Sequence, residues 1–257
     1  IDKKKFSEVL NKAKKLGFAE SNPVSDLNGD DSAAKLRILS SIAFNITISK
    51  NKILTEGIQN INLKDILHAK NLGYKIKLLA ISEVKQNKLI ERVHPCLVLN
   101  NSLIANIDGV INAIIIDGQP IGRSILQGEG AGPGATSSAL VSDLCSILRG
   151  NIKYPFGIPV VKRKDIKSYN KDNYSNSLYL RFEVKDKPGV LSDITNRLAK
   201  YKISVKRIIQ TPDKRNKKAT IVIITHKSKE SSSNNCLSIF KKNKNIVKKP
   251  TLIRLFG

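Results

Sequence analysis

Four charged residues near the start of the chain are of the types that carry out acid–base chemistry. Asp31 and Lys35 are four residues apart in a stretch with helical apolar spacing, so their side chains fall on one face of a helix. Glu20 and Asp26 lie on the polar loop that leads into this helix. An ammonium group can stabilise developing negative charge on an oxygen and deliver a proton, while carboxylates can orient that ammonium or hold a cationic amine. The alternative is a solvated ion pair worth about a few tenths of a kcal/mol.

A glycine-rich run at residues 128–134 is a second candidate site. It does not fit the dinucleotide fingerprint G-x-G-x-x-G, because Pro133 and Ala135 stand where that pattern needs glycine. It also lacks the acidic residue that follows in a βαβ unit. Glycines nevertheless permit close backbone approach to a ligand, and the N-terminus of the helix that follows adds a positive pole. A purely structural turn is the alternative.

The elements that position these residues follow from apolar periodicity, which predicts three helices and then two pairs of strands in the first part of the chain. The helices cover residues 6–16, 31–43 and 63–71, and the strands cover 76–84, 89–98, 109–117 and 121–126. Asp117-Gly118 is the predicted turn of the second strand pair. Residues 135–148 predict a buried helix of small residues. Helices followed by an antiparallel-looking sheet indicate an α+β layer.

The rest of the chain predicts a polar linker and a second unit. Residues 151–176 are rich in Pro, Lys, Asn and Ser, which is typical of a domain boundary. Strands at 178–184, 205–210, 219–225 and 251–256, with helices at 189–201 and 234–242, give the β-α-β-β-α-β order of a ferredoxin-like unit. The predicted fold class is therefore α+β: helices packed on a mostly antiparallel or mixed sheet, followed by a ferredoxin-like βαββαβ domain. The predicted domains are 1–150 and 177–257.

Composition narrows the class of protein. The 257 residues carry a formal net charge of +24, but the lysines are scattered and not interleaved with aromatics, so no nucleic-acid partner is expected. No apolar run approaches the roughly 20 residues that span a bilayer, so we expect no membrane partner and a cytoplasmic location. The three widely spaced cysteines and three histidines lack ligand spacing, which predicts reduced thiols and no metal. The absence of Met favours a truncated N-terminus.

The first two candidate sites together resemble the homoserine dehydrogenase family. The family's D-x-x-G-x-D-x-x-x-K segment is matched at every fixed position, by Asp26, Gly29, Asp31 and Lys35. Residues 17–23 resemble the segment that precedes it, although Asn22 stands where the family often has Asp. Residues 128–136 resemble the family's G-x-G-A-G-x-x-x-T segment, in the same order along the chain. The run Asp-Lys-Pro-Gly-Val-Leu at 186–191, together with the βαββαβ order, resembles an ACT domain; on its own, this run is an ordinary helix entry.

This resemblance implies NAD(P)H-dependent reduction of L-aspartate 4-semialdehyde to L-homoserine, a step toward threonine and methionine. Lys35 and Asp31 would be catalytic, while Glu20 and Asp26 would bind the substrate, Glu20 through its amino group. The implied cofactor-binding residues are Gly130, Ala131, Gly132 and Thr136, with most of the cofactor held by a nucleotide-binding domain that this sequence lacks. The implied effector-binding residues are Asp186, Gly189, Val190 and Leu191, and the usual effector in the family is threonine.

The resemblance also implies a homodimer or a higher homo-oligomer, and a chain that is inactive on its own. A non-catalytic, amino-acid-sensing scaffold is the alternative function, although a scaffold has no reason to retain Glu20, Asp31 and Lys35 together. A basic RNA-associated protein is a third possibility, which steeply salt-dependent binding would reveal.

Overall fold

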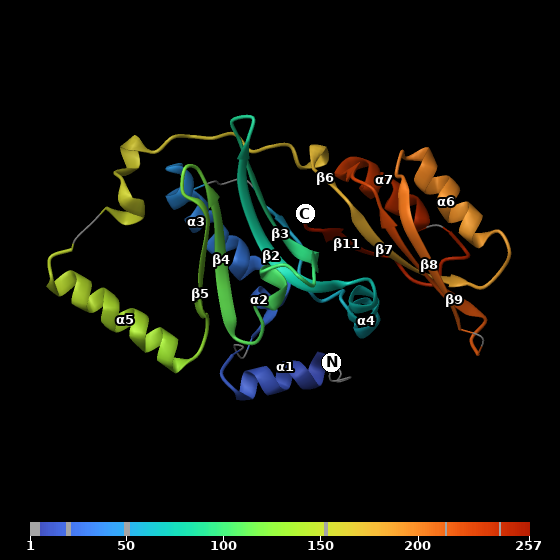
Figure 1. The fold of residues 1–257 in the computed structure, drawn as a ribbon, viewed down its shortest axis with the longest axis horizontal. Coiled ribbons are helices and arrows are strands. Elements are labelled where there is room, and N and C mark those ends of the chain that lie inside the picture. The colour runs from blue at the N-terminus through green and yellow to red at the C-terminus, as the bar shows by residue number, and fades with distance from the viewer. Residues whose placement is uncertain (1–5, 19–21, 49–51, 152–153, 214, 242) are drawn as a thin grey trace.

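The computed structural model describes residues 6–18, 22–48, 52–151, 154–213, 215–241 and 243–257. They form an elongated molecule, with the last third of the chain at one end and α5 (Pro133–Leu148) at the other (Figure 1). One sheet runs through the middle and is shared by the first and last parts of the chain. The fold is therefore α+β with a mixed sheet, as the sequence predicts.

The first part of the chain is built on a long antiparallel hairpin. β2 (Tyr74–Lys85) and β3 (Lys88–Leu99) pair along their whole length, and Gln86 and Asn87 both have positive φ in the tight turn between them. α3 (Asp30–Phe44) packs on this hairpin by burying Ala33 and Leu36 against Val93. The other elements here are α1 (Phe6–Lys15), α2 (Val24–Asn28), β1 (Leu54–Thr55), α4 (Leu63–Asn71) and the short η1 (Ile104–Asn106).

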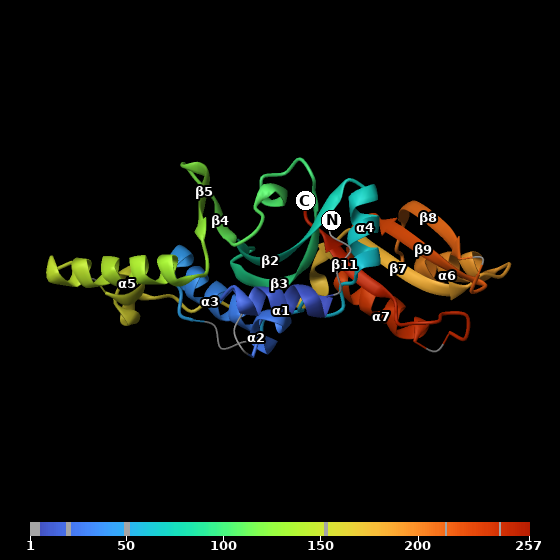
Figure 2. The same ribbon diagram turned by 90° about the horizontal axis from the view of Figure 1, so that it is seen from below.

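A second hairpin stands apart from the main sheet. β4 (Ile111–Gly118) and β5 (Gly122–Glu129) form their own two-stranded sheet, and α5 follows them to the outer edge of the molecule (Figures 1 and 2). The chain then returns toward the other end through short turns of 3-10 helix, η2 (Pro155–Gly157), η3 (Val160–Lys162) and η4 (Lys171–Asn173).

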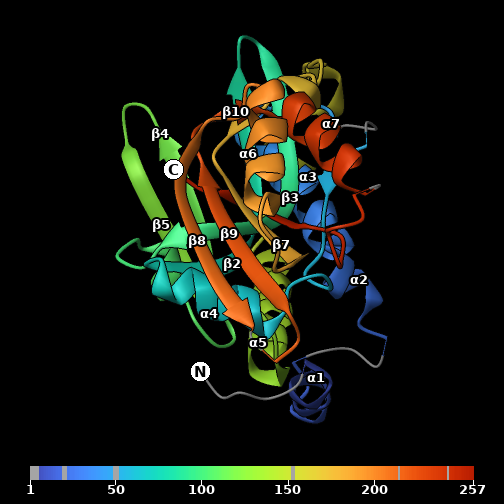
Figure 3. The same cartoon turned by 90° about the vertical axis from the view of Figure 1, so that its right-hand side faces the viewer.

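The last third of the chain has the predicted ferredoxin-like arrangement. Its strands lie in the order β11-β7-β9-β8 with every neighbouring pair antiparallel, and α6 and α7 pack on one face (Figure 3). Phe182, Ile194, Leu198 and Phe240 are fully buried between the helices and this sheet. The elements are β7 (Leu178–Lys185), α6 (Val190–Lys200), β8 (Val205–Asp213), β9 (Lys218–Thr225), α7 (Glu230–Phe240) and β11 (Thr251–Leu255). The short strands β6 (Ser175–Asn176) and β10 (Ser228–Lys229) pair separately.

The two parts of the chain join through β3 and β11. These strands run parallel, with Arg254 opposite Cys96 and Leu255 opposite Leu97. Among the described residues the main sheet therefore has seven strands, in the order β1-β3-β11-β7-β9-β8 with β2 on β3. Apolar residues from both parts, including Leu97 and Ile253, bury together at this junction. The limits 1–150, 151–176 and 177–257 stay a prediction.

Three local predictions are wrong. The polar loop before α3 contains α2, which ends at Gly29 in the left-handed conformation that a helix end favours. The turn of the second hairpin lies at residues 119–121, because Asp117 and Gly118 still pair, with Arg123 and Gly122. The helix at 135–148 is not buried, since no described element covers its apolar face; its exposed apolar residues are Leu140, Val141, Leu144, Ile147 and Leu148.

Candidate active site

The predicted catalytic pair lies on the first turns of α3. Lys35 Nζ is 2.7 Å from Asp31 Oδ2, and the two side chains are 66% and 41% exposed. Asp26 lies on α2, and Gly29 serves both as the end of α2 and as the residue before α3, with φ of 84°. Gly29 therefore makes the turn between α2, which carries Asp26, and α3, which carries Asp31 and Lys35. Glu20 lies outside the described residues.

Residues 57 and 58, which the sequence analysis did not single out, pack against the end of α2 just before this turn. The place of a Cβ on Gly57 lies 1.9 Å from the carbonyl oxygen of Leu27 and 2.6 Å from the Cα of Asn28, so only glycine fits there. The amide of Ile58 donates to the same Leu27 carbonyl at 2.9 Å. In the sequence, this contact is indicated only by a Glu-Gly pair after a short apolar run, and such a pair does not predict a particular contact.

The glycine-rich run lies apart from the acid–base pair. Gly132 has φ of 109° and precedes α5, and no side chain caps this helix. A Cβ on Gly130 would overlap the Asn112 side chain, while the Thr136 hydroxyl donates to the Gly132 carbonyl at 3.1 Å. Within the described ranges no hydrogen bond or ion pair joins Gly130, Ala131, Gly132 or Thr136 to Asp31 or Lys35. Figures 1 and 2 place α5 at the edge of the molecule.

The predicted effector residues come together at the first strand-to-helix turn of the ferredoxin-like unit. An open depression of about 440 Å³ is lined by residues 184–191, which include Asp186, Gly189, Val190 and Leu191, together with Gln210 and Ile221. Gly189 has φ of 84° at the start of α6, so the turn needs a glycine. The depression thus lies between the end of β7, the turn into α6, and residues of β8 and β9.

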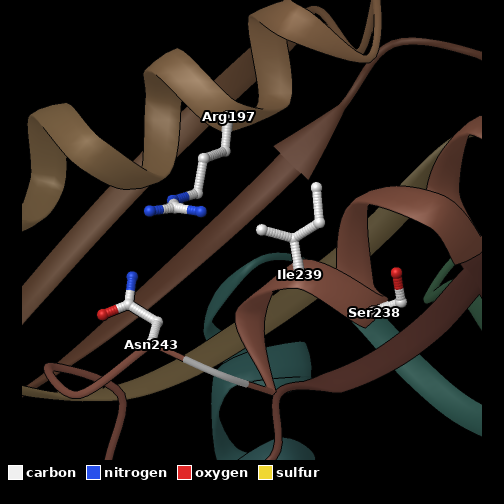
Figure 4. A pocket seen from close by; sticks show the side chains of 4 residues that line it. All are labelled: Arg197, Ser238, Ile239 and Asn243. Atoms are coloured by element: carbon white, nitrogen blue, oxygen red, sulfur yellow. The ribbon is translucent and has the colours of Figure 1, made fainter.

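A second depression, of about 420 Å³, lies between α6 and α7 and is lined by Arg197, Ser238, Ile239 and Asn243 (Figure 4). Its polar groups already have partners. Asp193 accepts from Arg197 Nε at 2.8 Å and from the Asn243 amide at 2.6 Å. We therefore interpret it as packing between the two helices.

Two buried arginines of the last third bind carboxylates of the first part. Arg181 on β7 donates to both oxygens of Asp65 on α4, at 2.6 and 3.1 Å, and also contacts Glu183. Burial, the largest single cause, lowers the pKa of Arg181, but the hydrogen bonds to Asp65 and the nearby negative charges together outweigh it, and the pKa is raised. The Tyr179 hydroxyl also donates to Asp65, and burial followed by the Asp65 charge raises the Tyr179 pKa.

Arg254 on β11 makes the other ionic cluster. It donates to both oxygens of Glu56, each at 2.8 Å, and to both oxygens of Glu230. Arg254 and Glu230 are only 2% and 3% exposed. Burial would raise the pKa of Glu56, but the hydrogen bonds and charge of Arg254 hold it below its usual range. None of the charged residues in these two clusters belongs to a sequence motif, so the sequence alone does not predict the clusters.

His94 and Cys96 lie beside this cluster in the buried strand β3. Burial first, and then the charge of Arg254, lower the His94 pKa to about 4, and burial raises the Cys96 pKa to about 12. Cys96, Cys145 and Cys236 are free thiols. Among the described residues, no group of three or more His, Cys, Asp or Glu could hold a metal ion, and no helix is long and apolar enough to cross a membrane.

Comparison with known proteins identifies first the class of the last third and then the family of the chain. The ACT domain family matches residues 178–238, which make up most of the ferredoxin-like unit. The homoserine dehydrogenase family matches residues 1–145, more than half of the chain. The chain belongs to the homoserine dehydrogenase family.

Individual relatives agree with this assignment. The homoserine dehydrogenase of Helicobacter pylori is 36% identical over 250 residues, and that of Neisseria gonorrhoeae is 34% identical over 257; each match covers 97% of this chain and 59% of the relative. Among solved structures, a homoserine dehydrogenase from Thiobacillus denitrificans is similar over the whole chain, with a TM-score of 0.88 and 34% identity, and again 59% of that protein is covered. The chain thus spans about 59% of the length of these relatives.

Proposed function

We propose that the protein to which this chain belongs reduces L-aspartate 4-semialdehyde to L-homoserine with NAD(P)H. The observation that carries this proposal is the Asp31–Lys35 ion pair beside the Gly29 turn, in a chain whose first 145 residues match the homoserine dehydrogenase family. The product stands on the route to threonine and methionine.

The acid–base pair supplies what reduction of an aldehyde requires. A bound nicotinamide would supply a hydride to the carbonyl carbon of the substrate, and the C=O π electrons would then reside on the oxygen. The Lys35 ammonium stabilises this charge and gives its proton to the oxygen, which completes the alcohol. Asp31, 2.7 Å from Lys35 Nζ, orients the ammonium. Asp26 and Glu20 bind the substrate, and the Glu20 carboxylate suits its cationic amine.

The glycine-rich run fits an anionic, phosphate-bearing cofactor. No side chain among the described residues caps α5, so the first amides of this 16-residue helix can face an anion. Gly130, Ala131, Gly132 and Thr136 would contact the cofactor. A part of the protein outside this chain would supply the rest of its binding surface.

Regulation and assembly belong to the same proposal. The depression that contains Asp186, Gly189, Val190 and Leu191 would bind an amino-acid effector, with threonine as the ligand to test first. The β4–β5 hairpin exposes apolar side chains on both faces, among them Ile114, Ile125 and Leu126, which favours a homodimer or a higher oligomer. We also propose that the protein works in the cytoplasm.

The test is an assay of the complete gene product for NAD(P)H oxidation with aspartate semialdehyde, with and without threonine. Activity that threonine lowers supports both the enzyme and its sensor. Activity that threonine leaves unchanged supports the enzyme and contradicts threonine as effector. A folded, complete protein without activity would overturn the proposal in favour of an amino-acid-sensing scaffold.

A further inference from the structure

The Arg254 cluster connects the last third of the chain to the candidate active site. Arg254 lies on β11, the strand that joins the ACT-type unit to β3. Its guanidinium holds both carboxylate oxygens of Glu56, and its remaining bonds go to Glu230 on α7. Arg254 and Glu230 are nearly inaccessible, whereas the Glu56 side chain is 40% exposed, so solvent can replace a partner lost by Glu56 but hardly one lost by Arg254.

Glu56 connects Arg254 to α2, which carries Asp26, and to the Gly29 turn that follows α2; together we call these the Asp26 turn. The Glu56 amide donates to the Val93 carbonyl at 2.8 Å, so the backbone of Glu56 is fixed on β3 while its side chain is fixed on Arg254. The next residue is Gly57, which touches the backbone of Leu27, and the amide of Ile58 donates to the Leu27 carbonyl. Leu27 is the neighbour of Asp26. The consecutive residues Glu56, Gly57 and Ile58 therefore link the buried Arg254 to the Asp26 turn.

Gly29, in the same turn, is packed closely against Val93 and Thr55. The place of a Cβ on Gly29 lies 3.2 Å from Val93 Cγ1 and 3.3 Å from Thr55 Cγ2. The turn between α2 and α3 thus lies directly on residues 55–57 and on β3. A displacement of Glu56 has to move this turn, and with it Asp26 and the start of α3, because close-packed contacts transmit small shifts.

We propose that Arg254 is a positioning residue for the substrate: by holding Glu56, it sets the place of the Asp26 turn, so that the ACT-type unit controls the affinity of the active site through its last strand. This inference rests on the proposed function, since it assigns Asp26 to substrate binding. It requires no contact between Arg254 and the substrate.

The chain contains a matched control in Arg181. This arginine is also buried in the ACT-type unit and also binds a carboxylate of the first part, Asp65. Asp65, however, belongs to the capping box of α4 with Asn62 and not to the segment under the Asp26 turn. Loss of Arg181 should therefore weaken the same junction without moving the Asp26 turn.

The experiment compares Arg254→Met and Arg181→Met in the complete gene product, with separate measurement of KM and kcat and with amide hydrogen exchange at Ile58. We expect Arg254→Met to raise KM for the amino-acid substrate about tenfold or more, because misplacement of a binding group by an ångström can cost up to about a hundredfold. The Ile58 amide should exchange faster in this variant. Arg181→Met should leave KM within about twofold and Ile58 exchange unchanged, even if both variants lose thermal stability.

Two results would overturn the proposal: an equal rise of KM in both variants, which indicates general loosening, or an unchanged KM and unchanged Ile58 exchange in Arg254→Met. If Arg254→Met does not fold, Glu56→Gln removes the charge of the same contact at constant shape and must give the same KM and exchange effects. A wild-type protein without activity would contradict the proposed function, yet faster Ile58 exchange in Arg254→Met alone would still support the positioning role.

Discussion

Lys35 and Asp31 owe their contact to the geometry of a helix start. Residues four apart on a helix face each other, and acidic residues are favoured in a first turn, where the helix dipole is positive. The exposure of both side chains means that the pair adds little to stability, since exposed ion pairs contribute about 0–1 kcal/mol. Stability therefore does not account for this pair, and we propose that its role is chemical, since it holds an ammonium in one direction.

Lys35→Ala is therefore expected to abolish turnover without unfolding the protein. Loss of a positioned general acid typically costs about a hundredfold to ten-thousandfold in rate. Steady-state kinetics and the thermal midpoint of the complete gene product check both parts of this statement. Lys70→Ala, at another exposed lysine on α4, is the control and should behave as wild type. Near-normal turnover in Lys35→Ala would remove the proposed mechanism.

His94 should make the stability of the folded chain depend on pH. Its pKa falls from about 6.5 in the unfolded chain to about 4 in the folded one, so the folded state binds fewer protons between these values. The stabilising contribution is complete above about pH 6.5 and is lost as pH falls toward about 4. Between about pH 7.5 and about pH 5 this amounts to about 2 kcal/mol.

Urea unfolding at these two pH values tests the contribution of His94. His94→Gln should lose clearly less free energy of unfolding than wild type over this interval, because the carboxylates titrate in both proteins. His68→Gln is the comparison: the pKa of this less buried histidine is also lowered, by burial and then by Arg181, so its loss should weaken the pH dependence in the same direction. An identical pH dependence in wild type and His94→Gln would contradict the assignment.

Among whole elements, those with regular apolar spacing could be predicted from the sequence, and those defined by distant contacts could not. α4, β2, β3 and the βαββαβ order follow from local patterns. The pairing of β3 with β11 could not be predicted, because no local signal relates Cys96 to Arg254. The candidate site follows the same rule. The Asp31–Lys35 contact could be predicted because the two residues are near neighbours in the chain, whereas the Glu56–Arg254 contact could not, because these residues are 198 positions apart.

α5 shows where a correct element was given a wrong environment. Its apolar composition predicts burial, yet Leu140, Leu144 and Leu148 are 66%, 56% and 77% exposed. These three residues lie on one face of the helix, at intervals of four. We expect this face to be covered in the complete protein, either by the part that this chain does not span or by a second copy.

Leu144→Ala distinguishes a covered α5 from an exposed one. In the 257-residue chain the substitution should change the free energy of unfolding by less than about 0.5 kcal/mol, as at an exposed site. In the complete gene product it should cost about 2–5 kcal/mol, as at a buried leucine. Leu198→Ala in α6, a fully buried site, should cost this much in both proteins. Equal, small effects of Leu144→Ala in both would show that α5 stays exposed.

Across the whole molecule, the predicted linker and the observed sheet lead to different expectations for unfolding. A polar linker at residues 151–176 suggests two domains that unfold independently, and such domains give separate transitions. The sheet, however, continues from β3 into β11, and the two buried arginines bind Glu56 and Asp65 across the same junction. If one part unfolded while the other stayed folded, the apolar residues at the junction would be exposed and its buried charges would lose their partners.

We therefore expect the described chain to unfold in one cooperative transition, with equal calorimetric and van't Hoff enthalpies and coincident fluorescence and circular dichroism curves. The double variant Arg181→Met/Arg254→Met should separate this transition into two, because it removes both buried ionic contacts and leaves the β3–β11 pairing and the apolar contacts around Leu97 and Ile253 to join the two parts. Two transitions already in the wild-type chain would mean that the junction is too weak to couple the parts. Arg254 could then not carry a change in the ACT-type unit to the Asp26 turn, and regulation would have to act through assembly instead.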